Sequence, residues 1–114
     1  MNFRTQLVND VFILMPEGRL LSETETMPVK EQIKSAIASQ KKKFIFDMKD
    51  VEFVNSTCLN FLVSSKNMIS AANASMVLCN VPEQLQRLLT VTKLDSFFII
   101  SANTSHALEM LATK

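Results

Sequence analysis

Two adjacent hydroxyl residues, Ser56 and Thr57, are the most suggestive chemical groups in this sequence. They follow Asn55, a residue type that often caps helices, and they open a long amphipathic stretch. The free N–H groups and the positive dipole end of a helix N-terminus favour a phosphate. A phosphate on Ser56 would add about −1.5 to −2 charges. The pattern allows a phosphorylation site at Ser56, although serine and threonine are also common in first turns without that role.

Other residues that could carry chemistry have simpler interpretations. Asp47 and Asp50 flank a strand end, where carboxylates could act in acid–base catalysis but more often cap or turn the chain. The single histidine, His106, is expected to be an ordinary surface residue. Cys58 and Cys79 form neither a zinc pattern nor a disulfide framework, so we expect two buried thiols in a reducing cytosol. We therefore expect no enzyme, no catalytic residue, no metal and no cofactor.

The helix expected from about Ser56 to Ala72 has two distinct faces. Seven residues share the stripe that should face the core: Cys58, Phe61, Leu62, Ser65, Met68, Ile69 and Ala72. The opposite face carries Ser56, Asn60, Lys66, Asn67 and Ser70 together with the apolar Leu59 and Val63. Two interpretations remain open for that apolar pair. They are either scattered exposed residues without a role, or a docking surface that runs down the helix from Ser56.

The rest of the chain alternates strand and helix patterns. Expected strands cover residues 2–8, 11–15, 19–21, 44–48, 51–54, 75–79 and 97–101, with turns at 9–10 and 16–18. Expected helices run from the caps Ser22 and Thr24 to near Gln40, with Pro28 in the first turn, from Pro82, and from Thr104 to about Ala112. Asn73 should end its helix in the left-handed conformation. The order predicts an α/β fold with a small mixed sheet, an antiparallel edge hairpin, a parallel centre and about four helices.

Composition and charge exclude several classes of function. Twelve Lys and Arg face eleven Asp and Glu, for a net charge of +1, so no global field attracts nucleic acid. The run of three lysines at 41–43 is expected to be solvated. No stretch approaches the roughly 20 apolar residues of a membrane helix, which predicts a cytoplasmic protein without membrane insertion. A single glycine excludes any glycine-rich phosphate loop.

Residues 44–59 resemble the signature of the STAS domain, the family of anti-sigma factor antagonists. The family form is an apolar strand ending in Asp, then Asp-Ser-(Ser/Thr/Ala)-Gly-Leu opening a helix. Residues 12–20 are similar to the family's second strand and its following turn, and residues 76–82 to its penultimate strand. Residues 85–99 and the pair Ala107-Leu108 resemble its C-terminal part. The resemblance spans almost the whole chain and implies a single STAS domain over residues 1–114.

The resemblance implies a partner-switching mechanism. The unphosphorylated protein would bind an anti-sigma-type serine/threonine kinase and so regulate transcription. The kinase would phosphorylate Ser56, with Thr57 as second choice, the phosphorylated protein would be released, and a metal-dependent serine phosphatase would reset it. The partner-binding residues would be Asn55, Ser56, Thr57, Leu59, Asn60 and Val63.

Three positions depart from the family form. Asn55 stands where the family has aspartate, Cys58 where it has glycine, and Leu21 where it has an acidic residue. Asparagine caps a helix as well as aspartate does, but it lacks the negative charge. The alternative function is a STAS docking or scaffold subunit that is never phosphorylated, for example in an ABC-type lipid transport complex.

Overall fold

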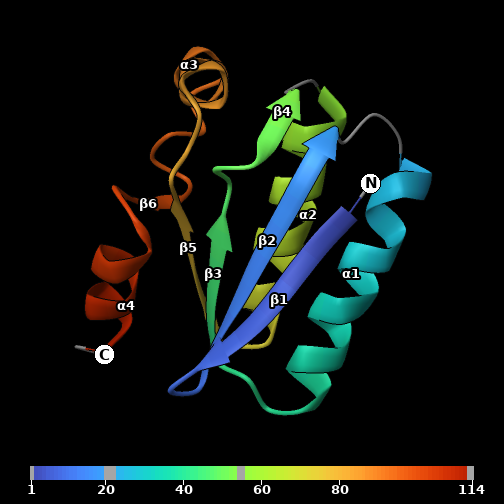
Figure 1. Cartoon of the computed structure of the whole chain (residues 1–114), viewed down its shortest axis with the longest axis vertical. Coiled ribbons are helices and arrows are strands. Elements are labelled where there is room, and N and C mark those ends of the chain that lie inside the picture. Colours follow the sequence, from blue (N-terminus) through green and yellow to red (C-terminus); the bar gives the residue numbers. More distant parts are fainter. Residues whose placement is uncertain (1, 20–22, 54–55, 113–114) are drawn as a thin grey trace.

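Strands and helices alternate along the chain in the computed structural model. The model describes residues 2–19, 23–53 and 56–112. Within these ranges it does not describe the side chains of residues 2, 19, 23–26, 52–53, 56 and 112. These residues form six strands and four helices (Figure 1). The strands are β1 (Asn2–Val8), β2 (Val11–Arg19), β3 (Lys43–Asp47), β4 (Val51–Phe53), β5 (Ser75–Cys79) and β6 (Ile99–Ser101). The helices are α1 (Glu23–Ala38), α2 (Ser56–Ala71), α3 (Glu83–Val91) and α4 (Thr104–Ala112).

The sheet is mixed, as the sequence predicted. Its strand order is β1-β2-β3-β5-β6, and β4 pairs separately with β2. Only the β1–β2 pair is antiparallel among the described strands. Asn9 and Asp10 join these two strands with φ values of 48° and 71°, the geometry of a tight two-residue hairpin turn.

Helices cover both faces of the sheet, which explains why its central strands are continuously apolar. Leu14, Phe46 and Leu78 point to the face beneath α1 and α2, within one core cluster. Ile13, Ile45 and Val77 alternate with them and form a second cluster beneath α4. Figure 1 shows α1 and α2 on one side of the sheet and α4 on the other.

The prediction of a turn at residues 16–18 was wrong, because β2 continues through them as far as Arg19. Pro16 lacks an N–H donor but lies between the residues that pair with β3 and those that pair with β4. Its missing donor therefore interrupts no ladder. Gly18 has a φ of +81°, which glycine adopts without strain, and the register shifts beside it. Leu20, Leu21 and Ser22 lie outside the described residues.

Helix α1 differs from its prediction at its start. It begins at Glu23, so Thr24 is inside the helix instead of capping it and Pro28 lies beyond the first turn. It ends at Ala38, and Gln40 has a left-handed φ of 69°. The left-handed ending predicted for the following helix is confirmed, because Asn73 has a φ of 59°.

Candidate functional site

The end of β2 and the short strand β4 position the start of α2. Gly18 and Arg19 pair in parallel with Val51 and Phe53, and the Gly18 N–H donates to the Asp50 carbonyl at 2.9 Å. Helix α2 begins at Ser56, three residues after β4 ends. The N-terminus of α2 therefore lies at the sheet end where β2 and β4 finish (Figure 1).

The core face of α2 is confirmed at five of its seven predicted positions. The buried residues are Cys58, Phe61, Leu62, Ser65 and Ile69. Phe61 packs against Phe46 of β3, with ring centroids 6.1 Å apart. Met68 is only half-buried, and Ala72 follows the end of the helix. On the opposite face Asn60, Asn67 and Ser70 are exposed, as predicted.

Leu59 and Val63 are less exposed than the helical pattern predicted. Both are half-buried and pack against the main core cluster. Lys66 is also half-buried, with its Nζ 5.9 Å from the centre of the Phe97 ring. The apolar pair therefore supports the helix with part of its surface and leaves the remainder accessible to another protein.

Of the remaining predicted site residues, Ser56 and Thr57 lie in the first turn of α2. Asn55 and the side chain of Ser56 lie outside the described residues. Thr57 is half-buried, and its neighbour Cys58 is fully buried. The backbone thus brings Ser56, Thr57 and Asn60 into the first turns of one helix.

Helix α2 is nearly devoid of charge. Its sixteen residues, STCLNFLVSSKNMISA, contain Lys66 and no acidic residue. A phosphate on Ser56 would therefore be the only anion on this helix, at the end where the helix dipole favours it.

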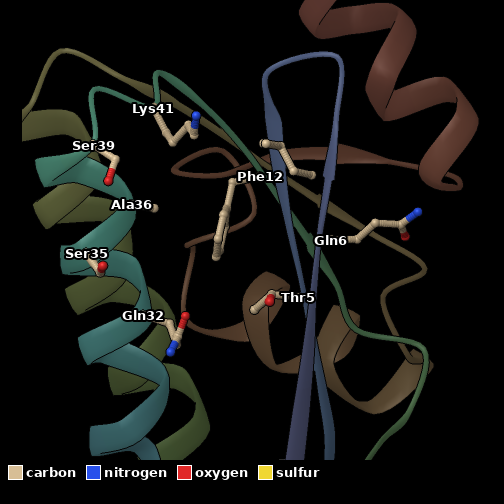
Figure 2. Close-up of a pocket in the computed structure, with 9 residues that line it drawn as sticks. Thr5, Gln6, Phe12, Gln32, Ser35, Ala36, Ser39 and Lys41 are labelled. Carbon is tan, nitrogen blue, oxygen red and sulfur yellow. The ribbon is translucent and has the colours of Figure 1, made fainter.

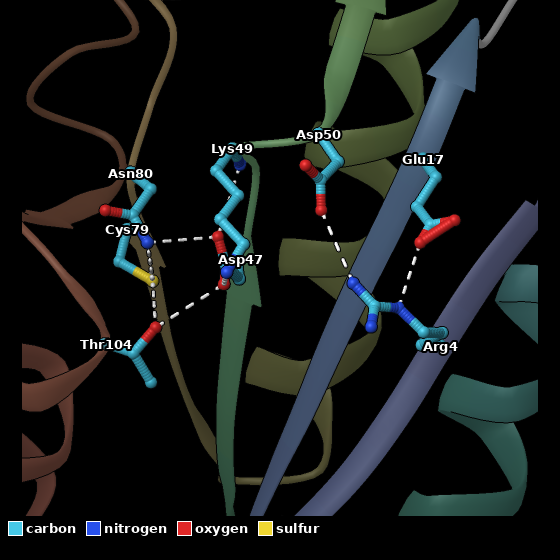
Figure 3. Close-up of polar contacts among 8 residues, drawn as sticks. All are labelled: Arg4, Glu17, Asp47, Lys49, Asp50, Cys79, Asn80 and Thr104. Carbon is cyan, nitrogen blue, oxygen red and sulfur yellow. Dashed lines mark hydrogen bonds and ion pairs between the residues drawn. The ribbon is translucent and has the colours of Figure 1, made fainter.

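Asp47 has a structural role, as the sequence favoured. This carboxylate is only 3% exposed. Its Oδ1 accepts from the Lys49 N–H at 3.2 Å and from the Asn80 amide at 3.1 Å. Its Oδ2 accepts from the Thr104 hydroxyl at 3.5 Å and lies 3.7 Å from the Lys49 ammonium (Figure 3). Asp47 thus ties the ends of β3 and β5 to the start of α4.

Asp50, in the loop that follows β3, belongs to a separate, exposed group. The Arg4 guanidinium lies 3.5 Å from the Asp50 carboxylate and 2.9 Å from that of Glu17 (Figure 3). Exposed pairs of this kind contribute little to stability. They do link the hairpin to the loop that leads into β4.

Neither cysteine thiol, Cys58 or Cys79, is activated as a nucleophile. Burial raises the pKa of the Cys58 thiol to about 11, and it is also the main cause of the raised pKa of Cys79. Both thiols therefore stay protonated at neutral pH. His106 is exposed, as predicted, and its Nδ1 lies 3.0 Å from the Ser101 hydroxyl. The backbone N–H of His106 donates to the side-chain oxygen of Asn103 at 2.8 Å, so Asn103 caps α4.

No helix in the described part of the chain is long and apolar enough to cross a membrane. No group of three or more His, Cys, Asp or Glu in that part of the chain could hold a metal ion.

The fold and this site together define a small α/β domain that presents the N-terminus of a helix at one end of a mixed sheet. The STAS domain model matches residues 2–107, and the chain belongs to the STAS domain family. This confirms the family predicted from residues 44–59.

Individual relatives agree with this membership. The chain is 29% identical over 107 residues to a Thermotoga neapolitana protein named as a candidate anti-sigma factor antagonist, covering 94% of this chain and 95% of that one. A crystal structure of a candidate anti-sigma factor antagonist from Thermotoga maritima matches with a TM-score of 0.86 and 27% identity, over 96% of this chain and 94% of that one. The phosphorylated form of the Bacillus cell fate determinant SpoIIAA shares the fold, with a TM-score of 0.76, 13% identity and coverage of 96% and 99%. Within its family, the chain is therefore similar to anti-sigma factor antagonists.

Proposed function

We propose that this chain is a cytoplasmic partner-switching regulator. When unphosphorylated it binds an anti-sigma-type serine/threonine kinase, and phosphorylation of Ser56 by that kinase releases it. The observation that carries this proposal is the position of Ser56 as the first residue of α2, a helix without acidic residues. The phosphorylated structure of SpoIIAA, a protein of the same fold, supports it.

The docking surface consists of Asn55, Ser56, Thr57, Leu59, Asn60 and Val63. Leu59 and Val63 supply the apolar contact, and the exposed Asn60 supplies a polar one. Because α2 carries only Lys66 as a charge, binding the unmodified protein requires little desolvation of ions.

Phosphorylation of Ser56 adds a charge that the kinase would have to desolvate in order to bind. A phosphate at Ser56 places up to two negative charges where the kinase closes over the helix. Burying those charges without a compensating partner is costly, so the complex dissociates. Shifting occupancy from 99:1 to 1:99 requires about 5.5 kcal/mol of differential binding free energy. The helix itself tolerates the phosphate, because the charge lies at its positive end.

A metal-dependent serine phosphatase completes the cycle by hydrolysing the phosphoserine. Removal of the phosphate restores the uncharged surface of α2. Thr57 is the second-choice phosphate acceptor, and its half-buried position makes it less accessible than a fully exposed hydroxyl.

The proposal predicts that the apolar pair on α2 is essential for kinase binding. Leu59→Glu and Val63→Glu should each weaken the affinity for an anti-sigma-type serine kinase from the same genome by at least about thirtyfold, the effect of a typical hot-spot residue. Isothermal titration calorimetry with the unphosphorylated protein measures this change.

Val91→Glu on α3 is the matched control, because Val91 is 79% exposed and lies on another helix. It should bind with the affinity of the unmodified chain. Thermal melting must show that all three variants are folded, since Leu59 and Val63 also pack against the core. Folded variants of Leu59 and Val63 that keep full affinity would refute the docking surface.

A further inference from the structure

Strand β1 is a long edge strand, with β2 on one side and no described strand on the other. It has seven residues, whereas the opposite edge, β6, has three. Natural proteins protect edges with short strands, prolines or lysines. The residues of β1, NFRTQLV, include neither proline nor lysine. Its only charged residue, Arg4, is paired with Glu17 and Asp50.

The register shows which backbone groups of β1 are available. Val8 and Val11 close the two-residue turn and so exchange backbone hydrogen bonds, and every second pair along the hairpin repeats this pattern. The N–H and C=O groups of Phe3, Thr5 and Leu7 therefore point away from β2, toward the open edge. An extended segment beside β1 could bond to all three residues.

A groove of about 260 Å³ opens between this edge and α1 (Figure 2). Leu7 and Phe12 provide its apolar surface, and Leu7 is 56% exposed. Gln32, Ser35 and Ser39 line the α1 side with uncharged polar groups. The groove therefore combines an apolar surface, side chains that can form hydrogen bonds, and the open edge of β1.

The charge of the groove selects an acidic occupant. Lys41 lines it, is half-buried, and makes no ion pair with any described residue. The residues that line the groove include no carboxylate. The adjacent Lys42 is not expected to bind a carboxylate of the occupant, because its ammonium donates to the Ala72 carbonyl at 2.6 Å.

We propose that the groove between β1 and α1 binds an extended acidic segment of a protein partner. The segment adds a strand to β1, places alternate apolar side chains on Leu7 and Phe12, and brings a carboxylate to Lys41. This surface shares no residue with the docking surface on α2. It gives the protein a second binding site that does not depend on Ser56.

Selection from phage-displayed random peptides tests the proposal, with one library ending in free carboxyl termini and one displaying internal segments. Peptides that bind the unmodified chain should alternate apolar residues and carry an acidic group. The library that yields binders distinguishes a terminal carboxylate from an Asp or Glu side chain. Single N-methyl groups on a selected peptide should weaken binding at alternate positions only, which is the signature of strand pairing.

Variants decide whether the selected peptides use the groove. Leu7→Lys should weaken their binding at least tenfold, and Lys41→Glu should weaken it and shift the selection toward basic peptides. Val91→Lys, an equally drastic change at an exposed apolar residue on α3, should leave binding unchanged.

Three results would overturn the proposal. These are recovery of no peptides, recovery of peptides without acidic groups, and binding that is insensitive to Leu7→Lys. A solution mass of twice 12.8 kDa that Leu7→Lys returns to 12.8 kDa would assign the edge to a second copy of this chain instead. None of these results bears on Ser56, which the kinase experiments test separately.

Discussion

Ser56→Asp is expected to weaken binding of the kinase by about a hundredfold, equivalent to about 2.8 kcal/mol. The substituted carboxylate places a permanent negative charge at the first residue of α2, within the docking surface. The kinase would have to desolvate that charge without compensation. The variant should remain folded, because an acidic residue in the first turn stabilises a helix by about 0.3–1 kcal/mol. Titration calorimetry against the unmodified chain measures the loss.

Asn67→Asp is the appropriate control for Ser56→Asp. It adds the same charge to an exposed position on the same helix, about three turns from Ser56 and about one turn beyond Val63. Its affinity for the kinase should stay close to that of the unmodified chain. Equal losses in both variants would show that the kinase responds to the net charge of α2 and not to a charge at Ser56.

Asp47→Ala is expected to lower the free energy of unfolding by about 2–3 kcal/mol, because hydrogen bonds to charged groups are strong and unpaired donors are costly to bury. The substitution leaves the Lys49 N–H, the Asn80 amide and the Thr104 hydroxyl without their acceptor. Urea denaturation followed by circular dichroism gives the difference. The variant should still bind the kinase when folded, since Asp47 lies outside the docking surface.

Asp50→Ala provides the comparison, three residues further along the chain. Asp50 is exposed, and the Arg4 guanidinium lies 3.5 Å from its carboxylate. Its removal should cost less than about 1 kcal/mol, as for other exposed ion pairs. Similar losses for both variants would contradict the structural role assigned to Asp47.

The sequence predicted the fold well because the hydrophobic pattern and the topology agree. The buried runs of β3 and β5 lie in the centre of the sheet, where both faces are covered and apolar residues predominate. The continuation of β2 through Pro16 and Gly18 could not be predicted. Those residue types usually mark turns, and only the change of neighbour from β3 to β4 shows why they are tolerated here.

The candidate site was predictable where it depends on one helix and not where it depends on tertiary contacts. Helical periodicity correctly separated Cys58 and Phe61 from Asn60. It overestimated the exposure of Leu59 and Val63, because it gives the direction of a side chain but not the neighbours beside the helix. The hydrogen bonds that Asn80 and Thr104 donate to the Asp47 carboxylate were also not predicted. They require knowing that β3 and β5 are adjacent and that α4 begins at their ends.

Locating the phosphate is the most direct test of the proposed switch. The chain should be incubated with ATP and an anti-sigma-type serine kinase from the same genome, then digested and sequenced by tandem mass spectrometry. We expect a single phosphate on Ser56, lost in Ser56→Ala, retained in Thr57→Ala, and accompanied by release of the kinase. Full phosphorylation of the Ser56→Ala variant would contradict the proposed switch. A chain that stays unphosphorylated and bound to the kinase would also contradict it, and would favour the function of a STAS docking subunit.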